Sequence, residues 1–211
     1  MSACGSIYSN TCCCSITKSK LLLISSLIAT DSLSEAKEYV EKWISEEPQL
    51  AENYELLAEV FKREVPVQDE KIREVYDKVL SLHPNNITAN LFWGTKAFNQ
   101  AKYEQAANYF ENILKEAFNL KAIKGFYLAN EKLYGKNVSL TETAKKLPNY
   151  QTDERQKTLL SQLYVFADAP ELAIEQLKNF DENSQYASEM ISTLSEAYIK
   201  NKDYRLAMEL L

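Results

Sequence analysis

Apolar residues recur every three or four positions along most of the chain. Leu57, Val60 and Phe61 show this spacing in one segment, and Phe110 and Ile113 show it in another. Residues three and four apart lie on the same face of an α-helix, so the pattern predicts a series of amphipathic helices. Each of these helices needs a neighbour that covers its apolar face.

The same pattern also repeats at a longer period. The segment Leu160-Ser161-x-x-Tyr164 recurs as Leu194-Ser195-x-x-Tyr198, and Pro170-x-x-Ala173-x-x-x-Leu177 recurs as Tyr204-x-x-Ala207-x-x-x-Leu211, both with a shift of 34 residues. Ala36 and Ala106 lie in the same phase as Ala173 and Ala207. A period of this length is typical of proteins that stack copies of one helix pair.

Residues 87–120 carry the pattern most completely, with Trp93, Gly94 and Ala97 followed by Ala106 and Phe110. This spacing resembles the tetratricopeptide repeat, in which W-x2-L-G-x2-Y is followed by A-x3-F and then by a proline. The resemblance implies an all-α fold, a right-handed superhelical solenoid of antiparallel helix pairs. A small residue such as Gly94 leaves space for a bulky one such as Phe110 on the other helix of the pair.

The repeat register divides the chain into a tail and an array. We expect a disordered, cysteine-containing tail at 1–16 and repeats at 17–50, 51–86, 87–120, 121–153 and 154–187, with a partial repeat at 188–211. Three repeats depart from the pattern. The first has Ile24 at a position for a small residue, the second has extra residues at 65–70 and Ile72 in place of alanine, and the fourth has a short, polar second helix at 139–147. The second repeat is therefore expected to have an enlarged turn.

Composition removes several classes of function. The 30 acidic and 24 basic residues give a net charge of -6, which is the wrong sign for a surface that binds nucleic acid. With 4 glycines and 5 prolines, a turn-rich β-fold or a glycine-rich phosphate loop is disfavoured. The only histidine, His83, has no nucleophile placed beside it by spacing, and the sequence contains no zinc or nucleotide motif. The sequence therefore predicts a non-catalytic protein without metal or cofactor.

All four cysteines lie near the amino terminus, at Cys4 and in the run Cys12-Cys13-Cys14. Adjacent cysteines do not readily meet disulfide geometry with each other. The remaining interpretations are reduced thiols in the tail, reversible acylation and a metal clip. The metal clip has the least support, because no histidine or second cysteine pair lies nearby.

The segment 18–29 has two interpretations. Lys18 and Lys20 precede an apolar run at 21–29, as in a secretory signal. The run is too short to span a membrane, and Leu27 stands where a cleavage site after Ala29 requires a small residue. The other interpretation is that this segment forms the first helix of the array.

In a stacked array the first helix of each repeat lines the concave surface. Helical phase then gives a candidate groove for a protein or peptide partner, made by Glu52, Glu55, Glu59, Leu91, Thr95, Phe98, Gln162 and Phe166. Ala122, Gly125 and Ala129 are predicted to form a depression in it, and Glu189 and Glu196 to add negative charge. The glutamates of the second repeat suit a basic segment of the partner, and the alternative is a solvated helix face.

These features favour a cytoplasmic protein-interaction scaffold or a subunit of a larger assembly. The alternative is an exported or membrane-anchored assembly factor of an envelope or lumen, with residues 18–29 as its signal or anchor. An enzyme whose site follows no known motif is the third hypothesis. Apolar residues at Ala207, Met208, Leu210 and Leu211 predict that the array continues in a longer chain or that two copies meet there.

Overall fold

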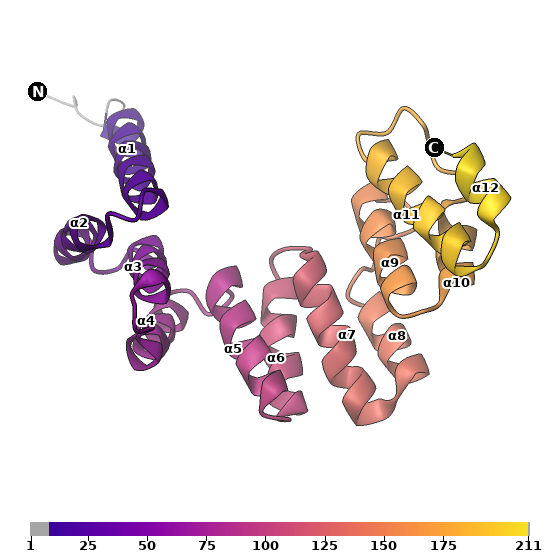
Figure 1. Ribbon diagram of the computed structural model, residues 1–211, viewed down its shortest axis with the longest axis horizontal. Coiled ribbons are helices and arrows are strands. Elements are labelled where there is room, and N and C mark those ends of the chain that lie inside the picture. Colours follow the sequence, from indigo (N-terminus) through magenta and orange to yellow (C-terminus); the bar gives the residue numbers. More distant parts are fainter. Residues whose placement is uncertain (1–8, 211) are drawn as a thin grey trace, which may run out of the picture. The chain divides into compact units, whose positions relative to one another are not determined.

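The computed structural model describes the backbone of residues 9–210 and the side chains of residues 19–210. Within residues 9–210 all regular secondary structure is helical, in twelve helices (Figure 1). The all-α fold class predicted from the sequence is confirmed. The chain divides into two compact units, Met1–Ala89 and Asn90–Leu211, which are described separately.

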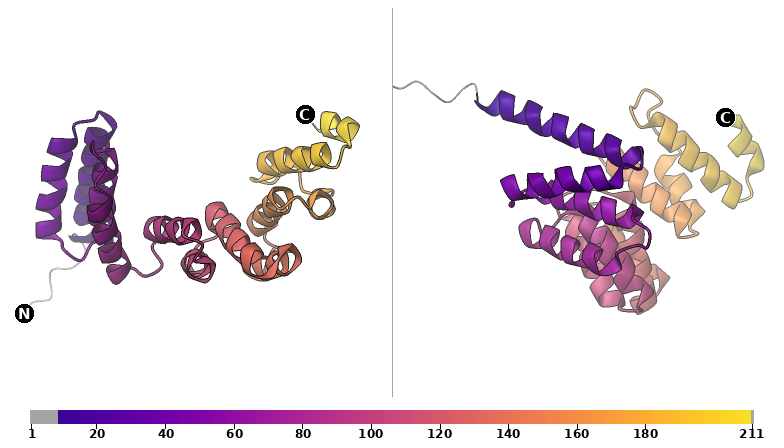
Figure 2. Two further views of the ribbon diagram at one scale, coloured as in Figure 1. Left: turned by 60° about the horizontal axis from the view of Figure 1, so that its bottom comes forward. Right: turned by 60° about the vertical axis from the view of Figure 1, so that its left-hand side comes forward.

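The first unit contains four helices that pack in chain order. They are α1 (Ser9–Ala29), α2 (Leu33–Glu46), α3 (Ala51–Arg63) and α4 (Asp69–Leu82). Helix α1 packs on α2 and α3, and α3 packs on α4, so these helices lie side by side (Figure 2). Ile24 is buried although its position usually takes a small residue, and Val40 and Trp43 of α2 are buried in the same unit.

Helix α1 begins earlier than the repeat register predicts. The expected boundary between tail and array lies after residue 16, whereas the helix extends back to Ser9. No glycine or proline interrupts the chain between Ser9 and Ala29, so nothing in this segment ends the helix. Residues 1–8 of the expected tail lie outside the described part of the chain.

The second unit contains the remaining helix pairs. They are α5 (Ile87–Asn99) and α6 (Tyr103–Leu114), α7 (Leu120–Tyr134) and α8 (Lys136–Ala144), α9 (Glu154–Phe166) and α10 (Pro170–Leu177), and α11 (Ala187–Lys200) and α12 (Tyr204–Glu209). The first three residues of α5 belong to the first unit. Helix α7 packs on α6 and α8, and α9 and α11 pack on each other and on α10. The main core of this unit surrounds Phe110, Phe126 and Leu160.

The alanines that share one phase in the sequence all lie in the interior. Ala36, Ala106, Ala173 and Ala207 are buried, and each is the fourth residue of the second helix of its pair. Ile72 takes the corresponding place in α4 and Ser139 takes it in α8, and both are buried. A small side chain here allows the second helix to approach the first closely, which is why the sequence pattern is detectable.

Four hairpins turn in the same way, although glycine stands at none of the four turns. The left-handed residues are Asp31, Ala101, Asp168 and Lys202, with φ of 61°, 58°, 54° and 67°. In the turn between α5 and α6, the Ala101 N–H donates to the Phe98 carbonyl and the Lys102 N–H donates to the Ala97 carbonyl, both at 2.9 Å. This pair of bonds is the Schellman motif, in which the left-handed position usually takes glycine.

We expect Ala101→Gly to stabilise the second unit. A β-carbon in the left-handed region costs about 1–2 kcal/mol, part of which the added freedom of glycine in the unfolded chain offsets. The free energy of unfolding should rise by about 0.5–1 kcal/mol, as measured by urea denaturation. As a control, Gln105→Gly on the exposed face of α6 should lower it. A loss of stability in Ala101→Gly would contradict the strain argument.

Two hairpins differ from the others, as the sequence predicts. The turn of the second repeat is enlarged, because α3 ends at Arg63 and α4 begins only at Asp69. In the fourth repeat, Gly135 with φ of 83° separates α7 from the short helix α8, which begins and ends three residues earlier than the helix predicted at 139–147. The buried Ser139 hydroxyl donates to the Tyr127 carbonyl at 2.6 Å, so a hydrogen bond replaces an apolar contact at the alanine position.

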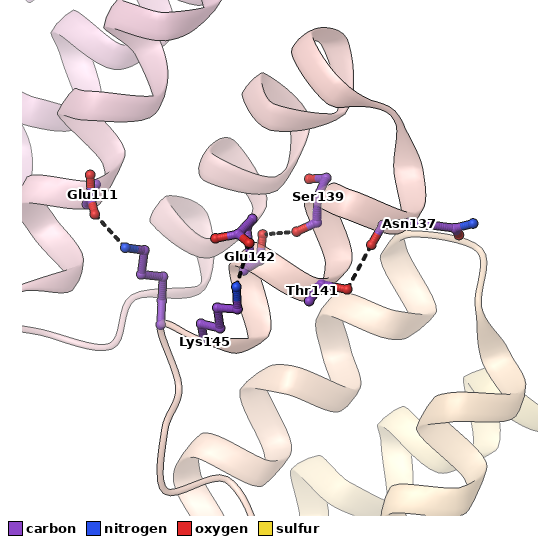
Figure 3. Close-up of polar contacts among 8 residues, drawn as sticks. Glu111, Asn137, Ser139, Thr141, Glu142 and Lys145 are labelled. Carbon is purple, nitrogen blue, oxygen red and sulfur yellow. Dashed lines mark hydrogen bonds and ion pairs between the residues drawn. The ribbon is translucent and has the colours of Figure 1, made fainter.

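Further polar contacts run along α8 and beyond it (Figure 3). The Thr141 hydroxyl donates to the Asn137 carbonyl at 3.0 Å, and the Lys145 ammonium pairs with Glu142 at 2.7 Å. Lys146, just after the helix, pairs with Glu111 of α6. These contacts hold a helix that has few apolar residues of its own.

Candidate functional site

A groove of about 500 Å³ lies along three helices of the second unit, α7, α9 and α11. Each of these is the first helix of its pair, and α9 packs against both of the others. Helix α9 therefore forms the floor, and α7 and α11 form the walls. We call this surface the α7–α9–α11 groove. Its polar, charged and aromatic lining includes Lys124, Gln162, Phe166, Glu189, Ser192 and Glu196.

The floor of the groove presents an aromatic ring held from two sides. Phe166, the last residue of α9, is 40% exposed. The Tyr127 ring meets it edge to face with centroids 6.3 Å apart, and the Lys124 ammonium lies 4.8 Å from its centroid. Because neighbours from α7 fix its orientation, Phe166 offers a rigid apolar surface at little cost in side-chain entropy.

The wall formed by α11 carries carboxylates. Glu189 lies in the first turn of α11 and Glu196 lies two turns later, and both side chains are exposed. Neither carboxylate forms an ion pair within the side chains that the structure describes. Between them, Ser192 is exposed, and the Thr193 hydroxyl donates to the Glu189 carbonyl at 2.7 Å. This wall offers two negatively charged hydrogen-bond acceptors to a bound molecule.

The two lysines of the groove have different roles. The Lys200 ammonium donates to the Val165 carbonyl at 2.7 Å, and Val165 lies in the last turn of α9. A cation at this position satisfies a terminal carbonyl and interacts favourably with the negative end of the helix dipole. Lys124 instead lies over Phe166 on the opposite side of the floor from α11. The groove therefore has one ammonium on the α7 wall and a second one, from the last residue of α11, that is bonded to the carboxyl end of α9.

Beneath the groove, Tyr127 is buried at 2% exposure and donates its hydroxyl hydrogen to Glu131 at 2.6 Å. Burial of the hydroxyl raises the Tyr127 pKa well above its usual value of 10.0, and the Glu131 carboxylate raises it further as the second cause. The folded chain therefore keeps this proton at a pH at which the unfolded chain releases it.

This difference predicts a loss of stability in alkali. The contribution of Tyr127 is complete below pH of about 10 and falls by up to about 1.4 kcal/mol for each pH unit above it, until the pH reaches the folded-state pKa. Tyr127→Phe should flatten the dependence of the unfolding free energy on pH above about 10. Tyr134→Phe, on the exposed part of α7, should leave it unchanged. Equal slopes for both variants would refute the prediction.

The structure distributes the site residues predicted from sequence over two units. In the second unit, Gln162 and Phe166 lie in the α7–α9–α11 groove together with Glu189 and Glu196. Leu91 and Phe98 are half-buried against the core, and Thr95 is exposed on α5.

The prediction of a depression at Ala122, Gly125 and Ala129 is wrong. Ala122 and Ala129 are buried, and the space beside Gly125 is filled by the Phe110 ring, which lies 2.6 Å from where a β-carbon would be. These small residues serve helix packing, because the face of α7 that carries them is covered by α6.

The glutamates predicted to attract a partner in the first unit are partly compensated. Glu55 accepts a hydrogen bond from the Asn86 side chain at 2.6 Å. Glu59 pairs with Lys62 at 3.3 Å and with Arg63 at 3.7 Å. Glu52 is exposed. A basic segment would therefore compete with existing partners for two of these three carboxylates.

No pattern in the sequence marks Lys124, Ser192 or Lys200 as groove residues. Lys124 and Phe166 are 42 positions apart, and no local pattern links them. Lys200 follows the last apolar position of its helix and resembles an ordinary exposed terminal lysine. Only the packing of three successive helix pairs brings these residues to one surface.

The described part of the chain also bears on a metal site and on a membrane span. No group of three or more histidine, cysteine, aspartate or glutamate side chains in residues 19–210 is arranged to hold a metal ion. The cysteine side chains lie outside the described ones. No helix between residues 9 and 210 has both the length and the apolar character needed to cross a bilayer.

The sequence matches no protein-family model and no curated protein. Solved structures do resemble it. A structure from a functional characterization of Pseudomonas aeruginosa pilF has a TM-score of 0.50 at 14% identity, with 92% of this chain and 87% of that chain covered. PilW, a widely conserved type IV pilus biogenesis factor, gives a TM-score of 0.48 at 14% identity and coverage of 92% and 90%. The TPR domain of P58(IPK) gives 0.47 at 19% identity, with 92% and 58% covered.

Proposed function

We propose that this chain, which has the tetratricopeptide repeat fold, is a non-catalytic scaffold that binds a segment of another protein in the α7–α9–α11 groove. The observation that carries the proposal is the lining of this groove on three first helices, where a fixed aromatic ring of α9 is combined with exposed carboxylates and hydroxyls of α11 and an ammonium of α7. Such a surface can hold an apolar side chain of a peptide and pair with its polar groups. A binding surface of this kind needs no reacting groups.

Site-specific photo-crosslinking tests this proposal. A photoreactive amino acid replaces Ser192, which is exposed in the groove, or Glu175, which is exposed on α10 outside it. The Ser192 position should crosslink one defined segment of a partner protein in cells, and Phe166→Ala should weaken that product. The Glu175 position is the matched control. Identical products from both positions, or products unaffected by Phe166→Ala, would contradict the proposal.

We propose a cytoplasmic location, in which residues 18–29 are a structural part of the array. Ile24 and Ile28 are buried, and the Arg63 guanidinium donates to the Ile28 carbonyl at 3.2 Å. Cleavage after Ala29 would remove these residues from the first unit. The alternative, an exported or anchored assembly factor, predicts a mature protein that starts near residue 30 or carries a lipid before it. Amino-terminal sequencing and intact-mass measurement of the protein from its natural source separate the two hypotheses.

Self-association through α12 is a further part of the proposal. Tyr204 and Met208 are exposed on this helix, and Ile199 of α11 is exposed as well. Exposed apolar side chains of this kind favour contact with a second copy or with another segment of chain. Sedimentation across a concentration series should show reversible dimers, and Met208→Ser should weaken them. A chain that remains monomeric at the highest concentration would exclude the dimer.

A further inference from the structure

We infer that the segment bound in the α7–α9–α11 groove is an extended, basic one, with two Lys or Arg side chains three positions apart that pair with Glu189 and Glu196. The inference rests on the proposed function and adds the chemistry of the partner. It follows from the spacing of the two carboxylates, from the distribution of charge in the groove and from the exposed ring on its floor.

Glu189 and Glu196 lie on one face of α11, and the helix fixes the distance between their backbone positions. They are seven residues apart, which is close to two helical turns and about 10.5 Å along the axis. A polyproline II segment has three residues per turn and rises 3.1 Å per residue, so side chains three positions apart point the same way at about 9 Å. In a β-strand, side chains on one face are about 7 or about 13 Å apart. Among extended conformations, the polyproline II spacing is the closest to the rise between Glu189 and Glu196.

The charge distribution in the groove indicates the sign of the partner's charge and the orientation in which the partner binds. Glu189 and Glu196 have no ion pair within the described side chains, whereas Glu55 and Glu59 of the first unit are engaged. Lys200, at the end of the same helix α11, is bonded to the Val165 carbonyl of α9, and Lys124 lies on the α7 wall. A segment with basic side chains toward α11 meets two unpaired carboxylates, and the same segment turned over would meet Lys124. Electrostatic complementarity therefore fixes one orientation.

The floor selects the residues between the two cations. In a polyproline II segment the intervening side chains point about 120° away from the basic ones, so one of them faces α9. There it meets Phe166, which is 40% exposed. Proline or another apolar residue suits this position, because proline keeps the segment extended and its ring packs on an aromatic face. The inferred motif therefore begins and ends with a basic residue. Two residues lie between them, and one of these two is apolar.

Fluorescence anisotropy with a series of labelled peptides tests the inference on the full chain. Three proline-rich peptides of equal composition carry two arginines separated by two, three or four positions. The peptide with a three-position spacing should bind about fivefold more tightly than the others, since each of the others loses one ion pair in a partly enclosed site. Affinity should fall as salt is raised.

Groove variants complete the test. Glu189→Gln and Glu196→Gln should each weaken the three-position peptide about fivefold and abolish the preference for its spacing. Glu171→Gln, exposed on α10 outside the groove, is the matched control and should change nothing. Equal affinities for the three spacings, glutamine variants that bind as the parent does, or no binding at millimolar peptide would each overturn the inference.

The crosslinking experiment distinguishes the failure of this inference from that of the proposed function. A groove-specific crosslink at position 192 to a segment without paired basic residues would overturn the inference and leave the scaffold function standing. The absence of any groove-specific crosslink would overturn both.

Discussion

Gly125→Leu is expected to destabilise the second unit by about 3 kcal/mol, near the upper end for overpacking a core. A β-carbon at Gly125 would lie 2.6 Å from the Phe110 ring, and a β-carbon at Gly94 would lie 2.8 Å from it. The ring is therefore held between α5 and α7 by two glycines, and it cannot move away from one without approaching the other. Glycine in a helix interior costs about 1 kcal/mol relative to alanine, and here the close packing of three helices offsets that cost.

A double-mutant cycle isolates this contact. Phe110→Ala alone should cost about 3–5 kcal/mol, and in that background Gly125→Leu should cost much less, because the leucine enters the space left by the ring. Lys121→Leu, at an exposed position of the same helix, is the control and should change stability by less than about 0.5 kcal/mol. The measurement is denaturant unfolding of each variant. Costs that simply add would show that Gly125 and Phe110 do not share this space.

The sequence predicted features that are set within one helix pair. The contact between Gly94 and Phe110 follows from the repeat spacing and is confirmed, because both residues belong to adjacent helices of one hairpin. The contact between Gly125 and Phe110 was missed, since it joins two repeats and the sequence gives no direct signal for it. For the same reason Gly125 was assigned to the groove, where only the position of α6 could have excluded it.

The candidate site was predictable to a similar extent. Helical phase identifies Phe166, Glu189 and Glu196 as residues of first helices that face away from the packing surface. Phase cannot give partners on other helices. The bond from Asn86 to Glu55 spans 31 positions and the stacking of Lys124 on Phe166 spans 42, and both changed the interpretation of the groove. The sequence therefore does not show which glutamates lack a partner, because their partners lie on other helices.

The left-handed turns also could not be predicted from the sequence. The repeat pattern gives the length of the connection, and Ala101 and Lys202 carry no local sign that they adopt a conformation usually taken by glycine. The chain has only 4 glycines, and these turns do without them. The helices on either side determine the turn, and the residue in it accepts the strain.

Ile28→Asp is expected to cost the first unit at least about 3 kcal/mol and to unfold it at moderate temperature. Ile28 is 4% exposed, so the variant loses apolar burial and moves a carboxylate out of water into the interior of the unit. Leu22→Asp is the matched control on the same helix, because Leu22 is 65% exposed and an aspartate there remains in water. It should change stability by less than about 0.5 kcal/mol.

This pair of variants also decides between the two interpretations of residues 18–29. If the segment is the first helix of the array in the mature protein, thermal unfolding followed by circular dichroism should distinguish Ile28→Asp from Leu22→Asp by a large shift in the transition of the first unit. If the segment is a signal that is removed, protein isolated from its natural compartment should unfold identically in both variants, since neither residue would remain. The burial of Ile24 and Ile28 favours the first outcome, because without them α2 and α3 would expose the apolar surfaces on which α1 packs.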